Sequence, residues 1–179
     1  MAKVKLVPIR PYLTGGDKRS VGQVEKVIGM VKHDPDLFVQ LIAGMTDADP
    51  LVRMRSADAV EKLSHDHPDW LQPYKVQLLG RIAEIDQQEV QWHVVAMIPR
   101  LSLNAQDRNR AMEIFKHDLD TSSSKIVQAF SMQAMFEISE DDPIIREEVV
   151  TICRDRLDNP SAAVRVRARN LLKEAEHHG

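Results

Sequence analysis

One stretch of this sequence occurs twice. DPLVRMRSADAVEKL, residues 49–63, has a counterpart near the other end of the chain in NPSAAVRVRARNLLKEA, residues 159–175. Both begin with Asp or Asn followed by proline, and both continue with Val-Arg-x-Arg into apolar residues at helical spacing. Similar helix openings at a fixed separation are typical of chains built from stacked repeats. The feature therefore predicts a repeat architecture if further copies lie between these two.

Two further copies do lie between them. The same apolar pattern recurs in successive steps of 38, 37 and 37 residues. The four sets are Val52, Ala57, Val60 and Leu63, then Val90, Val95, Ile98 and Leu101, then Val127, Met132, Met135 and Ile138, and finally Val164, Arg169, Leu172 and Ala175. Arg169 is the exception, and a charged residue at that position predicts a polar cap on the last repeat.

Each leading helix is followed by a second apolar pattern. These trailing helices are expected over residues 70–85, 106–119 and 143–157, and residues 19–32 and 35–45 predict an earlier, degenerate pair. An Asp or Asn stands directly before a proline at Asp34-Pro35, Asp49-Pro50, Asp142-Pro143 and Asn159-Pro160. This order suits a helix start, because the first side chain caps free amides and proline has none to lose. Ser122 to Ser124 offer the same capping for the fourth leading helix. The pattern predicts four hairpins and a final leading helix over residues 160–176.

Units of this length resemble HEAT repeats. The resemblance is carried by the Asp-Pro turn, the hydrophobic-Arg step, and Ala and Leu at core spacing. The matching residues are Asp49, Pro50, Val52, Arg53, Ala57, Ala59, Val60 and Leu63, with Asn159, Pro160, Val164, Arg165 and Leu172 in the last copy. The third unit departs, with Gln87-Gln88 in place of Asp-Pro, and carries Pro99 where a kinked leading helix is expected.

The resemblance covers residues 19–176 and implies an all-α fold. The expected architecture is a right-handed α-α superhelix, an α-solenoid of about 4.5 HEAT-like hairpins. Residues 19–179 are expected to form a single repeat domain. Residues 1–18 are expected to be a basic arm, extended or disordered, because they contain Pro8, Pro11 and Gly15-Gly16.

Charge and composition limit the classes of partner. Residues 1–32 hold seven basic and two acidic residues, and the remainder holds 17 basic and 25 acidic residues. An acidic body disfavours a dedicated nucleic-acid binder. No apolar run reaches the length of a signal peptide or a membrane span, so no membrane partner and a cytoplasmic location are expected. Cys153, the one cysteine, lies within an apolar pattern and is expected in the core.

The motifs give no reason to expect an enzyme. The sequence contains no glycine-rich phosphate loop, Gly-x-Ser-x-Gly elbow or zinc-binding set of cysteines. His65-Asp66-His67 lacks the spacing of a helical metal pair and indicates a turn or helix end. We therefore expect no cofactor, metal or small-molecule substrate. The predicted function is a non-enzymatic scaffold that presents a curved helical-repeat surface to a partner protein or peptide.

The resemblance implies that trailing helices line the concave, partner-binding face. The candidate residues are Trp70, Tyr74, Arg81, Arg108, Lys116, Arg146 and Arg154. The basic residues are either part of a mixed-charge groove for an acidic peptide or phosphate backbone, or an ordinary solvated face, which is the favoured interpretation. The aromatic pair is either an interface anchor or packs across the turn between helices, and packing is favoured.

Two other functions remain as alternatives. Some HEAT-like proteins are alkylpurine DNA glycosylases, which hold damaged DNA in a basic groove with Trp, Asp and Arg. Such a DNA-binding role would fall here to Trp70, Asp69, Arg108, Lys116 and Arg154. The acidic body argues against it, because phosphate contacts need positive potential. The other alternative is an accessory subunit of a larger enzyme, as with HEAT-like lyases that attach pigments to proteins.

Overall fold

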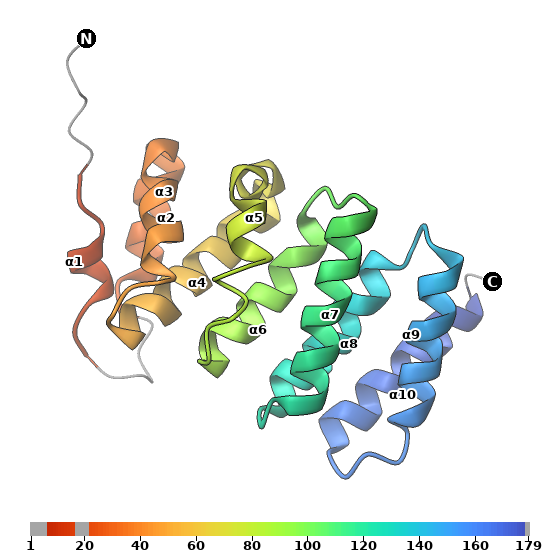
Figure 1. Ribbon diagram of the computed structural model, residues 1–179. Helices are drawn as coiled ribbons and strands as arrows, with labels where there is room; N and C mark the ends of the chain where they lie inside the picture. The colour runs from red at the N-terminus through yellow and green to blue at the C-terminus, as the bar shows by residue number, and fades with distance from the viewer. Residues whose placement is uncertain (1–6, 17–21, 178–179) are drawn as a thin grey trace. The chain divides into compact units, whose positions relative to one another are not determined.

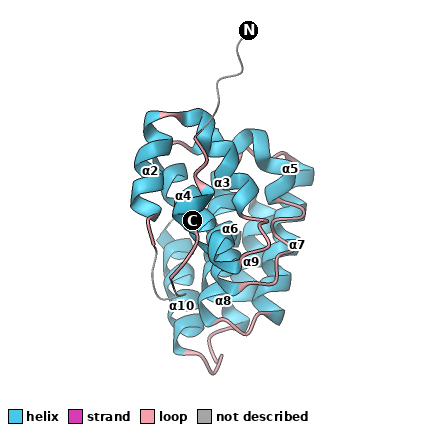
Figure 2. Ribbon diagram, turned by 90° about the vertical axis from the view of Figure 1, so that its left-hand side faces the viewer, coloured by secondary structure: helices cyan, strands magenta, loops and turns pink. Residues whose placement is uncertain are grey.

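The structure, a computed structural model, describes residues 7–16 and 22–177 of the chain. Every element in these two ranges is a helix or a connecting turn, and none is a strand (Figure 2). The predicted all-α fold is therefore confirmed. The chain divides into two compact units, residues 1–101 and 102–179.

The first unit is built around one long helix. Its elements are α1 (Arg10–Leu13), α2 (Val24–His33), η1 (Pro35–Leu37), α3 (Phe38–Gly44), α4 (Pro50–Asp66), η2 (Pro68–Tyr74), α5 (Lys75–Leu78), α6 (Gln88–Met97) and η3 (Ile98–Arg100) (Figure 1). Helix α4 packs against α2 and α3 of the preceding hairpin, against η2, and against the next leading helix α6. This is the nearest-neighbour packing expected of a repeat protein.

The second unit contains four longer helices. They are α7 (Ala105–Thr121), α8 (Lys125–Ile138), α9 (Pro143–Asp155) and α10 (Ala162–His177). Helix α8 packs against α7 and α10, and α9 packs against α10. Each leading helix is thus covered by a trailing helix and by its neighbour in the array.

The predicted apolar ladder forms the core of both units. In the first copy Val52, Ala57, Val60 and Leu63 are all fully buried, and every member of the next two copies is at most 9% exposed. In the last copy Val164 is buried, Arg169 is exposed, and Leu172 and Ala175 are partly exposed. The last copy therefore has the more polar flank predicted for it.

The helix starts follow the predicted capping pattern at Asp49, Ser124 and Asp142, whereas α10 begins at Ala162, two residues after the Pro160 expected at its first position. The Asp49 carboxylate accepts from the Leu51 amide, and the Asp142 carboxylate accepts from the Ile144 and Ile145 amides. The Ser124 hydroxyl caps α8, and the Asn159 side chain accepts from the Ser161 amide. Asp34 makes no side-chain cap at the start of η1.

A long polar side chain stabilises the turn before three of the leading helices, α4, α8 and α10. Arg53 donates to the carbonyl of Asp47 at 2.8 Å, and Arg165 donates to the carbonyl of Asn159 at 2.6 Å. Gln128 occupies the same place in α8 and donates to the carbonyl of Ser122 at 2.7 Å. In all three cases the acceptor lies six residues earlier, so a long polar side chain satisfies a carbonyl that the turn leaves free.

Two predicted helices differ from the expectation. The trailing helix expected over 70–85 is broken into η2, the short α5 and turns, and Pro73, which has no amide to donate, lies inside η2. Pro99 does not kink a continuous helix. Helix α6 ends at Met97, and Pro99 lies in the turn η3 that closes it.

Candidate functional site

The seven candidate residues fall in both units. Trp70, Tyr74 and Arg81 belong to the first unit, and Arg108, Lys116, Arg146 and Arg154 belong to the second. The pattern of apolar positions correctly placed the basic candidates of the second unit on α7 and α9, whereas Trp70 and Tyr74 lie in η2 and Arg81 lies in the turns after α5. The contacts that each side chain makes within its unit determine whether it is available to bind a partner.

The aromatic candidates pack within the first unit. The Trp70 ring stacks on His67 at a centroid distance of 4.1 Å and meets Phe38 edge-on at 5.5 Å. Tyr74 lies 5.9 Å from the same Phe38 ring. Both side chains are partly exposed, so each has a packing role and still presents an edge to solvent. Arg81 is exposed and has no ion pair within the described residues.

Two of the four basic candidates of the second unit are paired with carboxylates. Arg108 lies 3.3 Å from the Asp142 carboxylate, and Lys116 forms an ion pair with Glu148. Arg156 of the same unit bonds Asp120 at 2.6 Å. These pairs join residues 32 to 36 positions apart and connect α7 to α9 or to the turns beside it. Their charges are largely neutralised, which weakens the interpretation of this face as a phosphate-binding groove.

Arg146 and Arg154 line two surface cavities. The Arg146 guanidinium lies 3.7 Å from the Phe136 ring centroid and borders a cavity of about 470 Å³ with Glu137 and Glu140. Arg154 is exposed and borders a cavity of about 540 Å³ with Leu157 and Leu172. The first cavity lies among α8, α9 and α10, and the second lies between α9 and α10.

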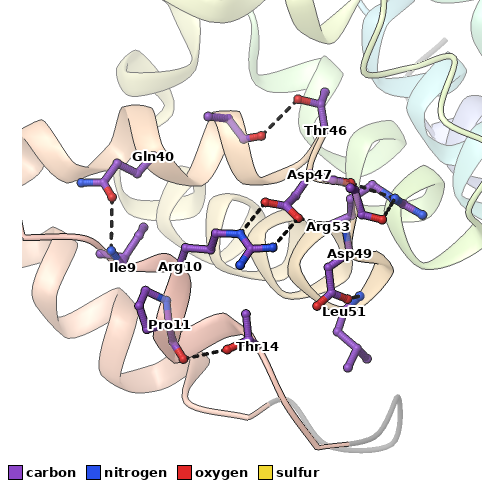
Figure 3. A network of polar contacts seen from close by, with 12 residues as sticks. Ile9, Arg10, Pro11, Thr14, Gln40, Thr46, Asp47, Asp49, Leu51 and Arg53 are labelled. Atoms are coloured by element: carbon purple, nitrogen blue, oxygen red, sulfur yellow. Dashed lines mark hydrogen bonds and ion pairs between the residues drawn. The ribbon is translucent and has the colours of Figure 1, made fainter.

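A groove on the first unit was not anticipated from the sequence. Here residues 7–15, the arm segment, lie against α3 and α4 (Figure 3). We use the name arm groove for the surface formed by Gln40, Gly44, Asp47, Val52 and Arg55. Ile9 and Leu13 of the arm segment are each 1% exposed, and residues 10–13 form the helix α1. For residues 7–16 the arm expected to be extended or disordered is therefore a packed segment.

Polar side chains of the arm groove bind the segment at both ends. Arg10 makes two bonds to the Asp47 carboxylate, at 2.8 and 2.9 Å. The hydrogen bonds from Arg10 and from the Asp49 amide lower the pKa of Asp47 to about 2. Arg55, 1% exposed, donates to the carbonyls of Leu13 and Gly15 at 2.9 and 2.7 Å. The one sequence signal for Arg55 was the second Arg of the Val-Arg-x-Arg motif.

Other titratable groups lie in the cores of the units. His93 is 3% exposed, and burial lowers its pKa to about 4. Burial raises the pKa of Asp118 to about 6 and the pKa of the Cys153 thiol to about 11. A neutral, 1% exposed thiol is a poor nucleophile, so Cys153 has the character of a core residue.

The described ranges contain neither a metal-binding group nor a membrane-spanning helix. Across residues 7–16 and 22–177, no group of three His, Cys, Asp or Glu side chains is placed to hold a metal ion. Over the same part of the chain, no helix has the length and apolar character needed to cross a membrane.

One comparison with known proteins identifies a family. A family model described as a HEAT repeat domain matches residues 16–175. Searches of curated proteins and of solved structures give no match. The match spans both units and agrees with the range of residues 19–176 that carries the repeat pattern.

Proposed function

Because the chain belongs to the HEAT repeat family, we propose that it is a non-enzymatic module that binds a partner protein or peptide on its trailing helices. Helical repeat proteins of this family often mediate protein interactions. Each unit offers one such surface: the outward face of α5, close in sequence to Arg81, in the first unit, and the outward face of α9, which carries Arg154, in the second. A cytoplasmic location remains a prediction of the same proposal.

One observation carries this proposal. Among the large hydrophobic residues that the structure describes, the two most exposed are Val76 at 81% and Ile144 at 83%. Val76 lies in α5 and Ile144 in α9, so both belong to trailing helices. Burying one aliphatic side chain contributes about 1.5–3 kcal/mol, which favours an apolar contact at these positions.

The contacts of the basic candidates do not favour the DNA-binding alternative. Arg108 and Lys116, which would have to contact phosphates, already have carboxylate partners. Breaking such pairs to bind DNA would expose the carboxylates Asp142 and Glu148 to the phosphate backbone. A partner with an apolar patch and an acidic residue fits each surface better, because Arg81 in the first unit and Arg154 in the second are exposed cations.

The test compares exposed aliphatic residues on trailing and leading helices. The double variant V76D/I144D removes the proposed contacts, and I126D/V166D introduces the same charges on α8 and α10, where Ile126 and Val166 are 56% and 49% exposed. Crosslinking capture at low salt, followed by identification of the bound proteins, should give partners that wild type and I126D/V166D retain and V76D/I144D loses. Equal retention by all three chains would contradict the proposal.

A further inference from the structure

The arm segment contacts the arm groove in the way a bound peptide contacts its receptor. The side-chain amide of Gln40 accepts a hydrogen bond from the backbone amide of Ile9 at 3.2 Å and donates one to the backbone carbonyl of Val7 at 3.1 Å. Arg55 binds two further carbonyls at the other end of the segment. Both ends of the segment are therefore held through backbone atoms, which any sequence supplies.

Specific side chains add selectivity to this backbone recognition. Ile9 and Leu13, four residues apart, point into the unit and are buried. Arg10, between them, extends to Asp47, and Figure 3 shows its guanidinium facing that carboxylate. The segment thus presents an aliphatic residue, an adjacent Arg and a second aliphatic residue, in the pattern aliphatic-Arg-x-x-aliphatic.

The arm segment does not fill the groove. A cavity of about 230 Å³ remains between the segment and the two helices, lined by Ile9, Leu13, Gln40, Gly44, Asp47 and Val52. A ligand with larger aliphatic side chains would therefore gain contacts that the arm segment lacks.

We infer that the arm groove is a peptide-binding site whose resident ligand is the chain's own arm segment, and that it also accepts a separate peptide of the aliphatic-Arg-x-x-aliphatic class. The tether gives the arm segment a high effective concentration, so a separate peptide competes only when it binds better or when the arm is weakened. This site lies on α3 and α4 and does not depend on the trailing-helix surface proposed above.

The experiment uses the full chain and a fluorescent peptide VPIRPYLTG, which has the sequence of residues 7–15. In the variant I9D/L13D the arm carries charges where its buried side chains stood, while every groove residue is unchanged. We expect this variant to bind the peptide at least about tenfold more tightly than wild type does, by fluorescence anisotropy. Equal affinities, or no binding to a variant whose circular dichroism shows it folded, would overturn the inference.

A charge exchange identifies the site and does not depend on the folding of I9D/L13D. Arg10 is 57% exposed, so R10D weakens the arm without disturbing the core. The R10D chain should bind the peptide. The D47R chain, whose arm is weakened because Arg10 then faces a second arginine, should not bind it and should instead bind the peptide that carries Asp in place of Arg. If D47R leaves both affinities unchanged, the groove is not the binding site.

A measurement of self-association shows whether the segment in the groove comes from the same chain or from a second copy of it. Sedimentation of wild type should give a monomer at the concentrations of the titration. A dimer that I9D/L13D abolishes would place a second copy's arm in the groove and overturn the occupancy inferred here. Failure of the peptide test leaves the trailing-helix proposal standing, because the capture experiment involves different residues.

Discussion

Arg55 makes the glycines beside it sensitive to substitution. Gly22 has a φ of +58°, and a Cβ added there would stand 2.9 Å from the Arg55 Cζ atom. We expect Gly22→Ala to lower the free energy of unfolding by about 1–3 kcal/mol, through backbone strain and this contact. Gly29→Ala is the matched control, since a Cβ at that helical position meets nothing within 4 Å and should stabilise by up to about 1 kcal/mol. Urea unfolding measures both, and equal effects would contradict the role given to Arg55.

The burial of Arg55 is a feature that could not be predicted from the sequence. Periodicity predicted that Val52 and Ala57 are buried, because apolar residues at helical spacing share one face. Arg55 has no such signal. A charged side chain is buried only when other groups bind it, and its acceptors, the carbonyls of Leu13 and Gly15, lie 42 and 40 residues away. The arm groove could not be predicted for that reason, whereas the exposure of Arg81 and Arg154 could.

At the scale of helices, Asp142 joins two functions that a pair of variants can separate. Its carboxylate caps α9 through the Ile144 and Ile145 amides and also binds Arg108. Asp142→Ala should cost about 1–2 kcal/mol of unfolding free energy, because both contacts are lost. Asp142→Asn retains a capping oxygen, so it should cost only the ion pair, at most about 1 kcal/mol. Thermal unfolding followed by circular dichroism measures the difference, and identical losses would show that the cap contributes little.

Helix boundaries were predictable where local chemistry sets them. α8 and α9 begin after Ser124 and Asp142, whose side chains bond amides two or three residues later, so the signal lies entirely within the local sequence. The helix expected over 70–85 is interrupted because Pro73 has no amide to donate, and the spacing of apolar residues takes no account of this. Pro99 also ends a helix where the family pattern suggested a kink. Proline is compatible with a bend or a stop, and packing of the surrounding repeat determines which occurs.

At the scale of the whole molecule, the charge of the chain does not favour binding to an anionic polymer. The net charge is −3, and Arg108, Lys116 and Arg156 are in ion pairs within the second unit. We expect no salt-sensitive binding to duplex DNA, because released counterions provide most of the affinity of non-specific binders. Anisotropy titrations at about 50 and about 200 mM salt test this. A binding constant that falls steeply between them would favour the DNA-binding alternative.

Each unit contains a buried titratable group, and the two groups change the stability of the fold in opposite directions as the pH rises. The pKa of His93 in the first unit is lowered from 6.5 to about 4, so its contribution is complete above pH 6.5 and is lost as the pH falls toward 4. The pKa of Asp118 in the second unit is raised from 3.8 to about 6, so its neutral form contributes stability at low pH that is lost as the pH rises through 6.

Substitution of each group should therefore change stability at a different pH. Asp118→Asn should raise the free energy of unfolding at about pH 8, by on the order of 2 kcal/mol, and this gain should vanish near pH 4. His93→Gln should reduce the loss of stability that wild type shows between about pH 6.5 and 4, whatever its effect at neutral pH. Urea unfolding across this range, followed by Trp70 and Trp92 fluorescence for the first unit and by labelling of Cys153 for the second, measures both changes. Parallel pH profiles for wild type and Asp118→Asn would show that the Asp118 carboxyl titrates near its ordinary value.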